Sequence, residues 1–336
     1  AVEVAGIGDT ITVGDGDYVA PDQPDGIKVT KAVVIKSQNG PKKTILKGGG
    51  NNRVVTMTNN AWVEGFTITG GNEKNNATIY PGEGGGVCVY NSTLVNCIVT
   101  GNKSSNKSYG GGAGIVMYGE SLVSGCIISN NVANNSEPEG GGVRMFTGIL
   151  ENSLITGNVA NYRGGGVFVC KTGSNPVIIR NCTIVKNERK HNNNEGNGIY
   201  VKKSDDYAQF RLIDSIVYGN FSNNSSHNDI VLSQPGQYSI VNTCTPTILE
   251  NSKLVYSKYF KNGKEDSTLK TLLTGDPKFK DYENGDFRLA PDSPCINNAY
   301  GEATTKTDLA GKKRVIGKAM DIGCYEFSLG FSVVVR

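Results

Sequence analysis

A short unit that recurs through the middle of the chain limits the possible folds more than any other feature of the sequence. A glycine run stands directly before an alternating apolar stretch in EGGGVCVYN, YGGGAGIVMY, EGGGVRMF, RGGGVFVC and EGNGIYVK, between Glu83 and Lys202. A second string recurs as GFTITGG, NCIVTGN, GCIISNN, NSLITGN, NCTIVKN and DSIVYGN, and its second residue repeats at intervals of 31, 29, 27, 29 and 33 residues from Phe66 to Ser215. Two independent markers with one period of about 29 residues indicate a repeat protein whose loops vary in length.

Each repeat unit consists of short β-type segments. The strings VCV, IVM, VRM, VFV and IYV place their first and third residues on one face and the second on the other. Such segments between Gly and Asn turns fit one coil of a parallel β-helix, in which equivalent segments stack about 4.8 Å apart. We therefore expect an all-β fold, a single-stranded parallel β-helix that occupies residues 1–336 as one domain.

Stacked coils place equivalent residues in columns. We expect one column of small, buried, inward-facing residues at Cys97, Cys126, Ser153, Cys182 and Ser215. A second column lies five residues further on, at a turn, where side-chain amides can hydrogen-bond along the axis and tolerate the left-handed conformation; it comprises Asn102, Asn131, Asn158, Asn187 and Asn220. Both columns are interpreted as structural ladders, and a metal or reactive role for the cysteines is the minor alternative.

The glycine runs also have a structural interpretation. Residues without a Cβ let the chain bend sharply and let neighbouring coils approach closely. The competing hypothesis is a phosphate-binding loop, but such a loop follows a strand and opens a helix, whereas these runs precede strands.

Charge and composition restrict the function classes. The net charge is +3, which gives no electrostatic case for nucleic-acid binding. No apolar stretch reaches the roughly 18 residues that a transmembrane helix needs. None of the eight cysteines forms a C-x-x-C pair, so we expect no zinc site. A monomer without a cofactor is the expected state.

The beginning of the chain resembles a known family. GDTITVGDGDY (Gly8–Tyr18), VTKAVVIKS (Val29–Ser37) and NGPKKTIL (Asn39–Leu46), followed by WVEGFTITGGN (Trp62–Asn72), are similar to the first coils of right-handed parallel β-helix proteins of the pectate-lyase-like group. The resemblance implies a right-handed helix, with an N-terminal cap and first coil over residues 1–50 and regular coils over 51–245.

The end of the chain resembles a second known region. GDPKFKDYENGDFRLAPDSPCINNAY (Gly275–Tyr300) and TDLAGKKRVIGKAMDIGCYEF (Thr307–Phe327) are similar to the choice-of-anchor Q region of secreted and surface-attached bacterial β-helix proteins. The resemblance implies an extracytoplasmic location, with residues 275–336 as a module that closes the last coil and 246–274 as an irregular excursion. A disulfide between Cys295 and Cys324 is one hypothesis for such a compartment.

The pectate-lyase-like resemblance raises the question of an enzyme. Lyases on this fold use acidic residues that hold calcium and a Lys or Arg base, and hydrolases use paired carboxylates. The acidic residues of the repeat fall mostly in turns, so we assign no catalytic residue, and calcium is expected only if the chain is a lyase. His191 and His227 lie in Asn-rich loops, and we interpret both as solvated loop residues.

The candidate binding surface is the outward column of the repeated VxV strands. Its members are Cys88, Val116, Arg144, Phe168 and Tyr200, with Glu83, Glu139, Arg163 and Glu195 in the loops beside them. Aromatic faces bind sugar rings and Arg pairs with uronate or sulfate, so Arg144, Phe168, Tyr200, Arg163 and Glu139 are the predicted contacts for a polysaccharide or cell-surface glycan. The alternatives are a column that the chain's own loops cover and a non-catalytic structural or adhesin-like surface protein.

Overall fold

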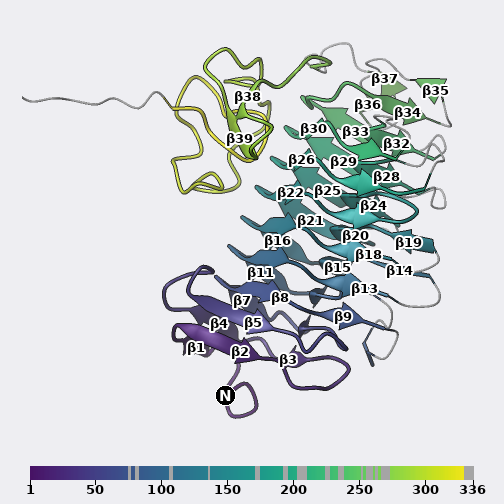
Figure 1. Ribbon diagram of the computed structural model, residues 1–336. Helices are drawn as coiled ribbons and strands as arrows, with labels where there is room; N and C mark the ends of the chain where they lie inside the picture. Colours follow the sequence, from purple (N-terminus) through teal and green to yellow (C-terminus); the bar gives the residue numbers. More distant parts are fainter. Residues whose placement is uncertain are drawn as a thin grey trace, which may run out of the picture.

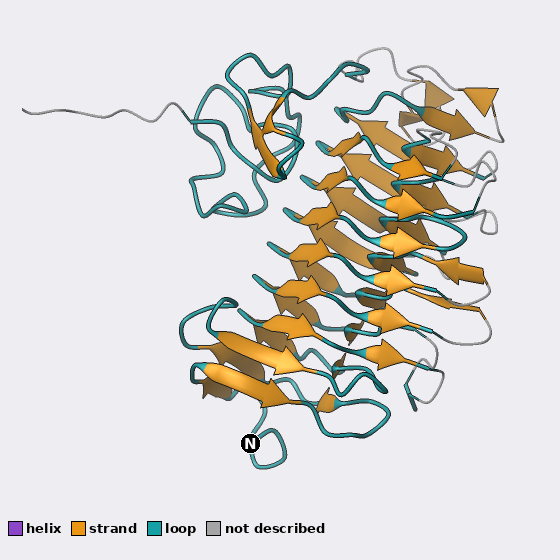
Figure 2. Ribbon diagram, in the orientation of Figure 1, coloured by secondary structure: helices purple, strands orange, loops and turns teal. Residues whose placement is uncertain are grey.

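The chain forms the predicted right-handed parallel β-helix in the computed structural model. The structure describes residues 1–74, 77–79, 83–105, 109–134, 137–170, 175–191, 196–202, 210–223, 228–233, 238–250, 253–254, 260–261, 264–265 and 273–328. Figure 1 shows the coils stacked from the N-terminal end to the C-terminal end, and Figure 2 shows that the described part consists of strands and loops. Within it, no helix is long and apolar enough to cross a membrane.

Three long sheets form the walls of the helix. Sheet A contains β1 (Thr10–Val13), β4 (Val34–Ser37), β7 (Trp62–Glu64), β11 (Thr93–Val95), β16 (Leu122–Ser124), β21 (Gly148–Glu151), β25 (Val177–Arg180), β29 (Phe210–Ile213) and β33 (Tyr238–Val241). Sheet B contains β2 (Gly16–Val19), β5 (Thr44–Lys47), β8 (Thr67–Thr69), β12 (Ile98–Thr100), β17 (Ile127–Ser129), β22 (Leu154–Thr156), β26 (Thr183–Val185) and β30 (Ile216–Tyr218). Sheet C contains β3 (Ile27–Val29), β6 (Val55–Met57), β10 (Val87–Tyr90), β15 (Ile115–Tyr118), β20 (Val143–Met145), β24 (Val167–Val169), β28 (Ile199–Val201), β32 (Ile230–Leu232), β34 (Ile248–Glu250) and β35 (Lys253–Leu254). The described strand pairs of the three sheets are all parallel except β34–β35 at the end of sheet C.

Shorter strands complete the described structure. Sheet D, at a turn of each coil, contains β9 (Asn72–Glu73), β13 (Lys103–Ser104), β18 (Val132–Ala133), β23 (Val159–Ala160), β27 (Glu188–Arg189) and β31 (Phe221–Ser222). Three two-stranded sheets pair β14 (Tyr109–Gly111) with β19 (Glu137–Glu139), β36 (Phe260–Lys261) with β37 (Lys264–Glu265), and β38 (Phe279–Asp281) with β39 (Asp286–Leu289).

The repeat sets the strand register. Val87 pairs with Ile115, which pairs with Val143, and that residue pairs with Val167. Because each strand lies beside its equivalent in the next coil, the inward residues form one continuous apolar core, and Cys97, Cys126 and Cys182 are buried in it.

The asparagine column forms a hydrogen-bonded ladder at the centre of the turn. Each Nδ2 donates to the Oδ1 of the next rung, at 3.1 Å from Asn102 to Asn131, 2.9 Å from Asn131 to Asn158, 2.9 Å from Asn158 to Asn187 and 2.8 Å from Asn187 to Asn220. The last rung, Asn220, donates to Asp229 Oδ1 at 2.8 Å. The left-handed conformation falls one residue earlier than predicted; its positions are Gly101, Asn130, Gly157, Lys186 and Gly219.

The glycine runs lie where another backbone segment leaves no room for a side chain. A Cβ on Gly85 would lie 1.8 Å from the carbonyl oxygen of Lys103, and one on Gly111 would lie 1.7 Å from that of Glu139 in the next coil. Both distances are far inside van der Waals contact, so a side chain at either position would push the two backbone segments apart.

The C-terminal module lies beside the upper coils, where Figure 1 shows it in yellow-green at the flank of the helix. Asn152 donates to the Thr307 carbonyl at 3.1 Å, the Cys324 N–H donates to Thr183 Oγ1 at 3.2 Å, and the Tyr300 N–H donates to Asp214 Oδ1 at 2.7 Å. Its contacts thus extend over several coils, beyond the last coil that it was predicted to close. Most of the predicted excursion 246–274 lies outside the described residues.

Candidate functional site

The predicted binding column lies on the outer face of sheet C, and it is buried. Cys88, Val116 and Phe168 have no exposed area, and Arg144 and Tyr200 are each 6% exposed. The glycine segments of neighbouring coils lie over it: a Cβ on Gly84 would meet Val116, and one on Gly112 would meet Arg144. The prediction that this column faces solvent is therefore wrong, and the covered column that was its alternative is what the structure contains.

Arg144 of the column and charged residues in the loops beside it form one ion-pair network. Arg144 places Nη1 2.8 Å from Glu83 Oε1 and Nη2 3.0 Å from Glu139 Oε2. Arg163 Nη1 lies 3.2 Å from Glu139 Oε1, and the Tyr118 hydroxyl donates to Glu83. Burial raises the pKa of Glu83, and the Arg144 charge opposes that rise.

The aromatic members complete the same network. The rings of Phe168 and Tyr200 stack with centroids 5.6 Å apart. The guanidinium carbon of Arg144 lies 5.6 Å from the Phe168 ring centre, and that of Arg163 lies 5.4 Å from the Tyr200 ring centre. The structure thus brings all five predicted residues together, but as internal partners of one another that fasten the covering loops to sheet C.

A second group of aromatic residues lines a pocket of about 470 Å³ between the helix and the C-terminal module. We call it the junction pocket. Tyr218, at the end of β30, forms its helix wall, and Phe279 and Tyr282 form its module wall. The three rings pack together: Tyr218 meets Phe279 and Tyr282 edge to face with centroids 6.3 and 6.0 Å apart, and the two module rings stack. All three side chains are half-buried. The Tyr282 hydroxyl donates to the Gly219 carbonyl at 3.1 Å, which fixes the module wall against the helix.

Polar groups surround the aromatic walls of the junction pocket. Lys278 Nζ lies 2.6 Å from Asp292 Oδ2, and Asp276 and Glu283 line the same pocket. The hydrogen bond from Lys278 lowers the pKa of Asp292. Carboxylates, an ammonium group and partly exposed rings thus converge on one concave surface.

Sequence reasoning missed the junction pocket, although one signal was present. The outward position that Tyr218 occupies carries Thr100, Ser129, Thr156 and then Val185 in earlier coils. The change from small hydroxyl residues to Val185 and then to a large aromatic residue marks coils whose outer surroundings differ. The aromatic residues in FKDYENGDF of the module gave the complementary signal.

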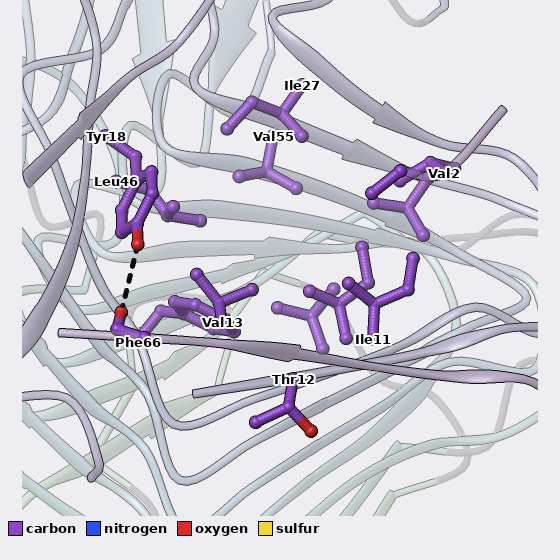
Figure 3. Close-up of a pocket in the computed structure, with 14 residues that line it drawn as sticks. Val2, Ile11, Thr12, Val13, Tyr18, Ile27, Leu46, Val55 and Phe66 are labelled. Carbon is purple, nitrogen blue, oxygen red and sulfur yellow. Dashed lines mark hydrogen bonds between the residues drawn. The ribbon is translucent and has the colours of Figure 1, made fainter. Parts of the chain in front are cut away.

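The N-terminal end of the helix contains a different kind of cavity, of about 390 Å³ (Figure 3). It is lined by apolar core residues such as Ile11, Leu46 and Phe66, and the Tyr18 hydroxyl at its edge donates to the Gly14 carbonyl at 3.2 Å. The cavity is the open end of the apolar core. Its few polar groups offer little to orient a polar ligand.

The cysteines and acidic residues were also considered as metal or disulfide sites. All eight cysteines are free. The hypothesis of a Cys295–Cys324 disulfide is wrong, because Cys295 lies in an apolar cluster with Cys244, whereas Cys324 lies in a separate cluster. Among the described residues, no group of three or more His, Cys, Asp or Glu side chains is arranged to hold a metal ion.

A comparison with solved structures identifies the fold. The crystal structure of the pectate lyase Pel9A matches with a TM-score of 0.56 over 97% of this chain and 90% of that chain, at 15% sequence identity. At this identity the likeness establishes a pectate-lyase-like parallel β-helix and nothing beyond the fold. No family model and no curated protein matches the chain.

Proposed function

We propose that this chain is an extracytoplasmic carbohydrate-binding β-helix protein and that the junction pocket is its glycan site. The observation that carries the proposal is the pairing of partly exposed rings at Tyr218, Phe279 and Tyr282 with Asp276, Lys278 and Asp292. Ring faces accept the apolar face of a sugar, and carboxylate and ammonium groups bond to its hydroxyls. The extracytoplasmic location rests on the resemblance of residues 275–300 and 307–327 to secreted proteins.

The fold supports a polysaccharide as the partner, since the solved structure with a similar fold is titled a pectate lyase. The proposal is for binding, and cleavage is an outcome that the product assays below test. The chain is proposed to act as a monomer without a cofactor. Calcium is proposed as a cofactor only if the assays detect cleavage.

The experiment is a glycan array with neutral, acidic and amino-sugar polysaccharides, with and without calcium, followed by titration of each hit and assays for reducing ends and unsaturated products. Tyr218→Ser replaces the ring with a small hydroxyl residue of the kind that Thr100, Ser129 and Thr156 provide in earlier coils, and Asp292→Asn removes one negative charge. Tyr300→Ala is the matched control, because Tyr300 is an aromatic residue of the same module, 60% exposed and outside the pocket.

We expect binding that falls at least tenfold in Tyr218→Ser and in Asp292→Asn and is unchanged in Tyr300→Ala. Equal affinity in all four proteins would remove the junction pocket from the proposal. Release of product would make the chain an enzyme. Circular dichroism of each variant separates a lost site from a lost fold.

The second candidate is a rigid, non-catalytic spacer of the cell surface. The specific observation in its favour is that the outer face of sheet C is closed by the chain's own ion pairs, while the asparagine ladder runs through successive coils. A folded chain that binds no glycan on the array, and that withstands pulling along its axis as a single unit, would favour the spacer.

A further inference from the structure

Two buried cysteines meet where the helix joins the C-terminal module. Cys244 belongs to the last coil: its N–H donates to the Ser215 carbonyl at 2.9 Å, and its own carbonyl accepts from Val217 at 2.9 Å. Cys295 belongs to the module, where its carbonyl accepts from the Ile322 N–H at 3.0 Å. Neither cysteine has exposed area, and both pack in one apolar cluster together with Ile216, Leu289 and Ile322.

The two cysteines are neighbours in this cluster at the joint. Cys244 Sγ lies 3.5 Å from the carbonyl oxygen of Gly275, where the module begins, and the interaction with the Cys295 thiol is the largest cause of the raised pKa of Cys244. The cysteines of the inward column differ from this pair because their thiols donate to carbonyls of their own or the preceding coil, for example from Cys97 to Val95 at 3.2 Å and from Cys126 to Ser124 at 3.4 Å. The Cys244–Cys295 contact is therefore a contact across the joint between two parts of the chain.

We propose that Cys244 and Cys295 are a disulfide-forming pair that covalently joins the module to the last coil under oxidising conditions. In the reaction, the two thiols lose two protons and two electrons, one S–S bond forms, and a disulfide oxidant such as oxidised glutathione is reduced to two thiols. This inference does not depend on the proposed glycan site.

Burial of the two thiols determines the conditions under which the disulfide can form. Thiol–disulfide exchange needs a thiolate, and the hydrogen bond with Cys295 together with burial raises the pKa of Cys244. The pair is thus unreactive while the module is seated, and it reacts during folding or when the module lifts from the helix. Once formed, the bond holds the two walls of the junction pocket together, since Tyr218 precedes Cys244 in the helix and Phe279 precedes Cys295 in the module.

The test uses the full chain. It is refolded with a glutathione redox buffer and, separately, with excess dithiothreitol; free thiols are then counted, peptides are mapped under non-reducing conditions, and the melting temperature is measured. Cys244→Ser and Cys295→Ser each remove one partner. Cys126→Ser is the matched control, because it removes a buried cysteine of the inward column.

We expect the oxidised wild-type chain and Cys126→Ser to lose two thiols, to give a peptide that links Cys244 with Cys295, and to melt about 5–10 °C higher than their reduced forms. Cys244→Ser and Cys295→Ser should do none of these. A full count of thiols after oxidative refolding, or a linked peptide with any other pair, would overturn the inference.

Discussion

The asparagine ladder of the coils and the C-terminal module bury polar groups in two different ways. In the ladder, each asparagine rung repeats the same neutral hydrogen bonds, as Asn158 does with Asn131 and Asn187. In the module, Arg314 is 2% exposed, pairs with Glu326 at 3.3 Å and donates to the Gly323 carbonyl at 2.7 Å. The ladder therefore distributes its stability over many equivalent contacts, whereas the module depends on a few that occur once.

The largest expected effect comes from breaking the buried ion pair. Arg314→Met leaves the Glu326 carboxylate buried without its partner, which should cost about 3–5 kcal/mol in the free energy of unfolding. The loss should fall on the module alone. Trp62, the single tryptophan, reports the coils by fluorescence, and limited proteolysis reports the module.

Arg288→Met is the control for this change, since Arg288 belongs to an exposed ion pair with Asp286 of the same module. It should change stability by less than about 1 kcal/mol. Simultaneous loss of the Trp62 signal and the module in Arg314→Met would show that the two regions unfold as one.

The next effect comes from removing one rung of the ladder. Asn158→Ala deprives Asn131 of an acceptor and leaves the Ile128 carbonyl without its donor, so we expect a loss of about 2–3 kcal/mol. Urea denaturation measures it, and Asn39→Ala, an exposed asparagine bonded to Asp15, is the control. A loss of stability no larger than that of Asn39→Ala would contradict a stabilising role for the rungs of the ladder.

A smaller effect distinguishes the two regions by pH. Burial raises the pKa of Asp229, at the end of the ladder, to about 7. Because the folded state binds this proton more tightly than the unfolded chain does, proton binding stabilises the fold. This contribution is fully present below the unfolded pKa of 3.8 and is lost as the pH rises through 7. Asp229→Asn should remove this dependence and make the chain more stable than the wild type at pH 8.

The pH dependence that remains in Asp229→Asn should include a contribution from the module, because burial also raises the pKa of Glu326 to about 7. Urea midpoints between pH 4 and pH 8 measure both contributions. An unchanged pH profile in the variant would show that Asp229 is not the group that titrates.

The smallest effect is expected inside the repeat. Cys126→Ser introduces the residue that occupies the same column at positions 153 and 215, where the Ser153 hydroxyl donates to the Glu151 carbonyl at 2.6 Å. The change in stability should stay within about 1 kcal/mol. A loss above about 3 kcal/mol in thermal unfolding would mean that the column is less uniform than its geometry suggests.

The sequence predicted features that repeat and missed features that occur once. The period placed strands of sheets B and C, and the shared spacing marked the rungs of the asparagine ladder. The sequence could not show that glycine segments fold over Arg144 and Phe168. The alternation of apolar residues reveals which residues share a face of a strand, but it does not reveal what covers that face. The junction pocket and the Cys244–Cys295 contact join residues far apart in the chain, without a repeated spacing that would reveal them.

The asparagine ladder has a direction: every rung donates toward the C-terminal end, and Asp229 accepts the last bond. The asparagine of an added coil would accept a hydrogen bond from the rung before it and donate one to the rung after it. The ladder would therefore remain complete wherever a whole coil is inserted. A partial insertion would leave a donor and an acceptor unmatched. The length of such a molecule can therefore change in evolution by duplication of complete units, each adding about 4.8 Å to the rod.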